Sequence, residues 1–127
     1  MKLELIGGLP FASVTLLYRG RSLILDTVLI DTGSGGSVFS ADKVGEIGLF
    51  FEAEDKMRRI SGVGGSEFVF SKRVNQLSIG DLVVTSFDIE VGEMNYGFEL
   101  EGIIGMDFLC QVNAVLDLSR LKIDHKK

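Results

Sequence analysis

Apolar and β-branched residues recur in short runs along most of the chain, and turn-forming residues separate these runs. The lengths of the runs and their enrichment in Val, Ile, Thr and Phe are typical of β-strands. The predicted extended segments run over residues 2–6, 11–18, 22–30, 37–39, 54–60, 66–74, 77–79, 82–91, 114–118 and 121–123. The pattern therefore predicts an all-β fold.

Two short helices interrupt the predicted strands. Ser40 is a good N-cap residue for a helix over 41–47, and Gly48 is a good residue to end it. A second helix is expected within 102–112, where we assign the N-cap to Asp107. The predicted architecture is thus a β fold with one or two short helices.

The overall composition indicates one globular domain. The chain has 127 residues, 46% of them hydrophobic, with a mean hydropathy of +0.30. These values predict a single domain over 1–127, with a tail from about residue 124. The net charge of −5 argues against a nucleic-acid partner, because there is no basic surplus to neutralise phosphates.

The cysteine and histidine content excludes several kinds of chemistry. Cys110 is the sole cysteine, so no intrachain disulfide forms, and its apolar surroundings predict a buried, inert thiol. The sole histidine, His125, lies next to the C-terminus of the sequence, which argues against Ser-His-Asp or Cys-His catalysis and against a metal site built on histidine. We therefore expect no metal and no other cofactor.

The sequence also suggests where the protein acts. The longest apolar run, 23–30, is interrupted by Asp26 and is too short to cross a bilayer. A secretory pattern is missing from the N-terminus, where Glu4 interrupts the apolar stretch. The expectation is a cytoplasmic protein without a membrane partner.

Residues 28–37 read VLIDTGSGGS and form the strongest candidate for a functional site. An apolar strand leads directly into Asp31, at the point where glycines let the backbone turn sharply. Glycines also let backbone N–H groups approach a carboxylate. An ordinary turn uses the same residue types, so this segment alone does not decide between a turn and a site.

Carboxylates catalyse hydrolysis best in pairs, because two close acids share one proton. Asp26 does not suit Asp31 as a partner: five residues of strand span roughly 16 Å, and an odd offset predicts opposite faces. Asp107 is better explained as a helix cap. One chain therefore supplies half of a carboxylate pair, and a two-fold homodimer would supply the other half.

Three segments, in order, carry a resemblance to a known family: LIDTGS at 29–34, SGVGG at 61–65 and GIIGMDFL at 102–109. Together they resemble the retropepsin-like aspartic peptidases, and the similarity extends over about 11–123. The resemblance implies a closed, mostly antiparallel barrel with one lobe per chain. It also implies a homodimer that hydrolyses peptide bonds in extended peptide or protein substrates.

The resemblance further implies roles for individual residues. Asp31 would be catalytic and would pair with Asp31 of the second chain, supported by Thr32 across the axis, by the Gly33 N–H and by a hydrogen bond from Ser34. A flap would close over the substrate, and other residues would line the cleft. These substrate-binding residues are Ile60, Ser61, Gly62, Val63 and Gly64 in the flap, and Gly35, Gly36 and Ile103 in the cleft.

Two features depart from the retroviral members of the family. The positions of an acid and an arginine that pair in those enzymes are Gly35 and Met106 here. The chain also continues through DLSRLKIDHKK at its C-terminus, where viral enzymes build their dimer interface. The details of the dimer are therefore expected to differ.

Two other hypotheses stay open from the sequence. The first is a non-catalytic dimer of the same fold that binds peptides or acts as a scaffold. The second is an unrelated β-barrel in which Asp-Thr-Gly is only a turn, which predicts a monomer.

Overall fold

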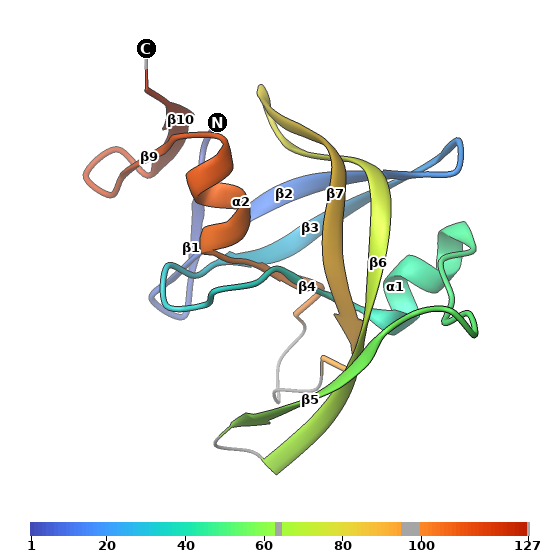
Figure 1. Ribbon diagram of the computed structural model, residues 1–127. Coiled ribbons are helices and arrows are strands. Elements are labelled where there is room, and N and C mark those ends of the chain that lie inside the picture. Colours follow the sequence, from blue (N-terminus) through green and yellow to red (C-terminus); the bar gives the residue numbers. More distant parts are fainter. Residues whose placement is uncertain (63–64, 95–99, 127) are drawn as a thin grey trace.

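The computed structural model describes residues 1–62, 65–94 and 100–126, and it is built mainly of strands (Figure 1). Helices and strands follow the chain as β1 (Glu4–Ile6), β2 (Leu9–Tyr18), β3 (Arg21–Ile30), β4 (Val38–Ser40), α1 (Ala41–Val44), the 3₁₀ turn η1 (Gly45–Ile47), β5 (Met57–Gly62), β6 (Gly65–Ile79), β7 (Leu82–Gly92), β8 (Gly102–Ile104), α2 (Met106–Gln111), β9 (Ala114–Asp117) and β10 (Lys122–His125).

The main sheet closes on itself into a barrel. Its strand order is β1-β2-β3-β8-β4-β7-β6-β5, and an additional pairing of β2 with β6 closes a ring of six strands. Most neighbours are antiparallel, whereas β3–β8 and β4–β7 are parallel. The predicted closed, mostly antiparallel all-β fold is confirmed.

Side chains that alternate along the strands fill the barrel. On β2, for example, Val14, Leu16 and Tyr18 are buried. Helix α2 covers one end by packing the buried Phe108 edge-to-face against Phe87, with ring centroids 5.9 Å apart. Burying a side chain of this size contributes about 1.5–3 kcal/mol, so α2 is firmly attached to the barrel.

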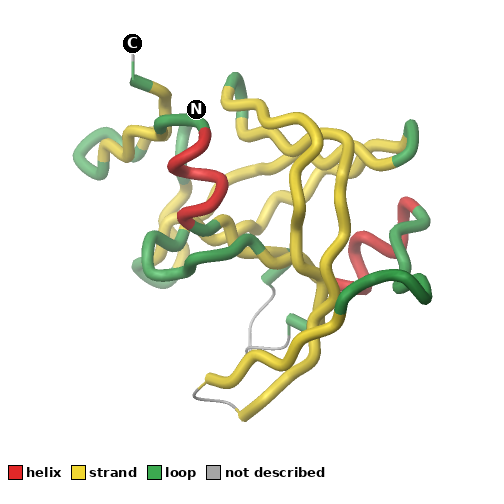
Figure 2. Tube along the Cα trace, in the orientation of Figure 1, coloured by secondary structure: helices red, strands yellow, loops and turns green. Residues whose placement is uncertain are grey.

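The hairpin β5–β6 extends out of the barrel, as Figure 2 shows. The two strands predicted at 66–74 and 77–79 are one continuous strand, β6. Its far half pairs with both β2 and β7, whereas its first residues pair with β5. The hairpin in which the sequence predicts a flap is therefore an extension of a barrel strand.

The first predicted helix is confirmed as α1 followed by η1, and Gly48 ends it in the left-handed conformation, with φ of 78°. Ser40 occupies the N-cap position, but its side chain makes no capping hydrogen bond.

The predicted tail from about residue 124 is wrong. Asp124 and His125 belong to β10 and pair with Val115 and Ala114 of β9. The Lys126 N–H donates to the carbonyl of Asn113. Backbone pairing with β9 orders this segment, which its polar composition could not indicate.

A buried ammonium group connects the segment before β5 to strand β6. Lys72 is 6% exposed, and its Nζ donates to Glu52 at 2.5 Å and to Asp55 at 2.7 Å. The hydrogen bonds from Lys72 lower the pKa of both carboxyl groups. Burial lowers the pKa of Lys72, but its bonds to Asp55 and Glu52 outweigh burial, and the net shift is upward.

These shifts predict how stability depends on pH. Because the pKa values of Glu52 and Asp55 are lowered in the folded protein, the charged carboxylates stabilise the fold. This stabilisation is complete above the ordinary pKa values of 4.5 and 3.8, and it is lost as the pH falls through the lower pKa values of the folded protein. The contribution of Lys72 is lost only at alkaline pH. We expect Lys72→Met to lose less stability on acidification than the parent, measured by urea unfolding from pH 7 to pH 3.

The control is Lys56→Met, which removes the same charge from an exposed lysine nearby. Its acid sensitivity should match that of the parent. If both variants showed the same acid sensitivity, the hydrogen bonds of Lys72 to Glu52 and Asp55 would not be a source of the pH dependence.

Candidate active site

Asp31 lies at the end of β3, where that strand runs parallel to β8. Its backbone N–H donates to the Ile104 carbonyl at 2.9 Å, and its Oδ1 accepts from the Gly33 N–H at 2.9 Å. The Ser34 N–H donates to the Asp31 carbonyl at 3.1 Å and closes a turn. The carboxylate is thus held at a strand end and is only partly buried.

The loop that follows Asp31 rests on the start of α2. The Met106 N–H donates to the Ser34 carbonyl at 2.8 Å, and the Asp107 N–H donates to the Gly35 carbonyl at 3.2 Å. The first N–H groups of a helix have no partner within the helix, so the loop satisfies them. At Gly105 a Cβ atom would lie 2.3 Å from the Gly36 carbonyl oxygen, so the two backbones meet without room for a side chain.

Ser37 and Asp107 form a buried junction beneath this loop. Ser37 is 1% exposed; its Oγ donates to Asp107 Oδ1 at 2.8 Å and accepts from the Gly105 N–H at 3.0 Å. The Ser37 N–H also donates to Asp107 Oδ2 at 3.2 Å. The prediction that Asp107 caps the helix is wrong: Gly105 holds the N-cap position, and Asp107 reaches across to Ser37 instead.

Sequence reasoning missed the Ser37–Asp107 junction. Asp107 was visible in the GIIGMDFL segment and Ser37 in VLIDTGSGGS, but the two residues are 70 positions apart. Only the packing of the loop onto α2 brings them together.

The Ser34 hydroxyl does not make the hydrogen bond to Asp31 that the resemblance implies. Its Oγ donates to the Gly36 carbonyl at 2.8 Å rather than to Asp31. The loop folds back within two residues, so a backbone acceptor lies within reach of this hydroxyl. Thr32 is exposed next to Asp31.

Ile103 is half-buried on the outer face of β8, because its neighbours Gly102 and Ile104 are buried on the other face. It pairs with Leu29 and Val38. This position is compatible with a lining role, which stays a prediction for Ile103 as it does for Gly35 and Gly36.

The flap residues are described only in part. Ile60, Ser61 and Gly62 pair through their backbones with Glu67, Ser66 and Gly65. Val63 and Gly64 lie outside the described residues. Their contact with a substrate therefore stays a prediction.

The odd offset between Asp26 and Asp31 predicted that they lie on opposite faces of the strand, and this prediction is wrong. The β2–β3 register shifts between Ala12 and Val14, where β3 has one extra residue, so Leu25 and Val28 both face the core despite their odd spacing. Asp26 is exposed and accepts a hydrogen bond from the Ser13 hydroxyl at 3.2 Å. The offset of five residues still places it roughly 16 Å from Asp31 along the strand.

Cys110 is exposed, so the prediction of a buried thiol is wrong. Phe108 and Leu109 form the buried side of α2, and Cys110 lies on the other side. The apolar neighbours in the sequence therefore do not surround it in space.

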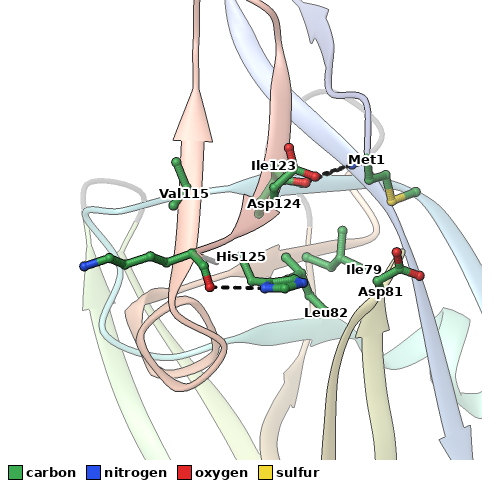
Figure 3. Close-up of a pocket in the computed structure, with 9 residues that line it drawn as sticks. Met1, Ile79, Asp81, Leu82, Val115, Ile123, Asp124 and His125 are labelled. Atoms are coloured by element: carbon green, nitrogen blue, oxygen red, sulfur yellow. Dashed lines mark hydrogen bonds and ion pairs between the residues drawn. The ribbon is translucent and has the colours of Figure 1, made fainter.

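A pocket of about 570 Å³ lies away from the Asp31 loop, between the first residue, the turn from β6 to β7, and β10 (Figure 3). The Met1 amino group forms an ion pair with Asp124 at 3.3 Å, and His125 Nδ1 lies 3.3 Å from the Lys126 carbonyl oxygen. The pocket is lined by Met1, Ile79, Asp81, Leu82, Val115, Ile123, Asp124, His125 and Lys126. It contains none of the predicted site residues, so Asp31 stays the candidate centre.

Within residues 1–62, 65–94 and 100–126, no group of three or more His, Cys, Asp or Glu side chains is placed to hold a metal ion. Among the helices described, none is both long and apolar enough to cross a membrane.

The closed barrel, with Asp-Thr-Gly at the end of β3 and a short helix beneath the loop, defines the class: a retropepsin-like aspartic protease domain. A family model described as aspartyl protease matches residues 14–108, a range that includes Asp31 and most of GIIGMDFL. The chain therefore belongs to the aspartyl protease family. No curated protein matches the sequence.

Proposed function

We propose that the protein is an aspartic endopeptidase that cleaves extended polypeptides as a homodimer, with the two Asp31 carboxylates sharing one water molecule. One observation carries the proposal: Asp31 is partly exposed at a strand end, and its Oδ1 is held by the Gly33 N–H. A carboxylate held in this way by a turn is suited to orient a water molecule.

In this mechanism the two Asp31 carboxyl groups have different protonation states. Two acids this close do not both ionise, so one is charged and the other carries the proton. The charged group takes a proton from water, and the resulting hydroxide attacks the peptide carbonyl. The protonated group donates its proton to the carbonyl oxygen. The tetrahedral intermediate then collapses, and a proton passes to the leaving amine.

The surface beside Asp31 supports a second copy as the partner. A shallow pocket of about 460 Å³ there is lined by Thr32 together with mostly apolar residues of α2, β9 and the turn between them: Met106, Leu109, Cys110, Asn113, Ala114 and Leu116. Leu118, directly after β9, is 66% exposed. In the described chain β9 pairs only with β10, which leaves one of its edges available for pairing.

A subunit-mixing experiment tests the proposal. An equal amount of Asp31→Asn chain, allowed to exchange with the parent, should reduce peptide cleavage to about half, because mixed dimers lack one acid. Adding the same amount of Asp26→Asn chain should cause no loss. Unchanged cleavage in the Asp31→Asn mixture, or a persistent monomer that still cleaves, would contradict a shared site. Peptide binding without any cleavage by the parent would favour the non-catalytic dimer.

A further inference from the structure

Arg58 and Glu90 form a bidentate ion pair between the projecting hairpin and the barrel. Arg58 Nε donates to Glu90 Oε2, and Arg58 Nη2 donates to Glu90 Oε1. The Arg58 side chain is 58% exposed, whereas that of Glu90 is 14% exposed. The bond to Glu90 also raises the pKa of Arg58, so its charge is permanent.

Strand pairing places Glu90 on the same face of the sheet as Asp31. Residues that pair directly across strands share a face. One row crosses five strands in this way, through Leu29, Ile103, Val38, Glu90 and Ser71. Asp31 follows Leu29 by two residues, so it lies on that face as well.

The opposite face of the same strands confirms this assignment. Ile30, Phe39, Val91 and Ile104, each next in sequence to a member of the row, are all buried in the core. The row therefore forms the outer side of the barrel wall, next to Asp31. Arg58 lies on the same face as this row, because it pairs with Val69, which precedes Ser71 by two residues on β6.

Glu90 also approaches the loop that follows Asp31. Its Oε1 lies 3.1 Å from where a Cβ of Gly36 would be, and its N–H donates to the Ser37 carbonyl at 2.9 Å. The absence of a side chain at Gly36 therefore makes room for the carboxylate. Glu90 therefore connects Arg58 to the loop that follows Asp31.

The outer edge of Arg58 is available for a ligand. A guanidinium group has five N–H donors, and the bonds to Glu90 use two of them. Nη1 donates to no acceptor in the part of the chain that the structure describes. Both oxygens of Glu90 are already engaged, so an incoming side chain meets a cation with free donors.

We infer that Arg58, oriented by Glu90, determines specificity by binding an acidic side chain of the substrate. This inference rests on the proposed peptidase function and names the substrate class. Three strand spacings of about 4.8 Å separate β3 from β7, or roughly 14 Å. An extended peptide advances about 3.3 Å per residue, so the acidic residue lies about four positions from the cleaved bond.

The test compares matched peptides that differ only at that position, as Glu, Gln or Lys. Their Kd values are measured with the Asp31→Asn dimer, so that no peptide is cut, and kcat/KM is measured with the parent. We expect the Glu peptide to bind about tenfold more tightly than the Gln peptide, as for a charge-assisted bidentate contact. Arg58→Gln should abolish this preference.

The variant Glu90→Gln distinguishes a role of the Arg58–Glu90 pair in substrate specificity from a purely structural role. If Glu90 orients Arg58 while repelling an acidic ligand, removing its charge should raise the preference for the Glu peptide. A mere clamp on the hairpin would instead weaken binding of all three peptides alike. The matched control is Arg59→Gln, because Arg59 is the next residue and stacks over Phe68, 5.3 Å from the ring centroid, on the other face of the hairpin.

Each outcome decides between the two proposals. Cleavage without any charge preference, or equal effects of Arg58→Gln and Arg59→Gln, would overturn the role of Arg58 and leave the peptidase proposal standing. An uncleaved set of peptides that still shows the Arg58-dependent preference would overturn the peptidase proposal alone. If no peptide binds, both are overturned.

Discussion

Replacing Asp31 with asparagine should reduce peptide cleavage by about a thousandfold or more, because an amide neither takes a proton from water nor donates one to the substrate. The fold should persist, since an asparagine Oδ1 can still accept the hydrogen bond from the Gly33 N–H. Cleavage of a mixed peptide library measures activity, and solution mass checks that the assembly is unchanged.

Asp26→Asn is the matched control for this prediction. It makes the same chemical change on the same strand, at an exposed side chain that contacts Ser13. Its activity should equal that of the parent. Retained cleavage by the Asp31 variant, with the assembly intact, would falsify the catalytic assignment.

Replacing Gly105 with alanine should cause the largest loss of stability among single changes near the site. The added Cβ would lie 2.3 Å from the Gly36 carbonyl oxygen and 2.7 Å from that of Ser34. Both are backbone atoms, so the loop or the start of α2 has to move. Overpacking against rigid atoms costs about 3 kcal/mol, which urea unfolding would detect.

The cause is space rather than backbone conformation, because Gly105 has a φ of −106°, which any residue adopts. Gly35→Ala in the same loop is the control, since a Cβ there would have no atom within 4 Å. Its unfolding midpoint should match that of the parent. A Gly105→Ala protein of parental stability would show that the loop and α2 are not in firm contact.

The local pattern of residues predicts most strands because side chains alternate between core and solvent within a strand. The alternation fails where the backbone is irregular. The extra residue in β3 near Asp26 reversed the expected face, and nothing in the segment marks a bulge. Strand β6 was split at Asn75, although pairing with β2 and β7 carries it through.

Two other predictions from the sequence, for one face of a helix and for the last strand, failed for a different reason. Cys110 has apolar neighbours in sequence, yet it is exposed because those neighbours occupy the other side of α2. Asp124 and His125 look like a polar tail, yet backbone hydrogen bonds to β9 hold them. In both cases the surroundings come from residues that lie elsewhere in the chain.

The sequence by itself determined the all-β class, the position of Asp31 after an apolar strand and the membership in a family of proteases, because these depend on local residue patterns and on the order of short motifs along the chain. Only the tertiary structure decided that Asp107 supports Ser37 and that Arg58 and Glu90 face the same side as Asp31. Such contacts join residues 70 and 32 positions apart. They arise from closing the barrel, which fixes the strand registers that no local pattern contains.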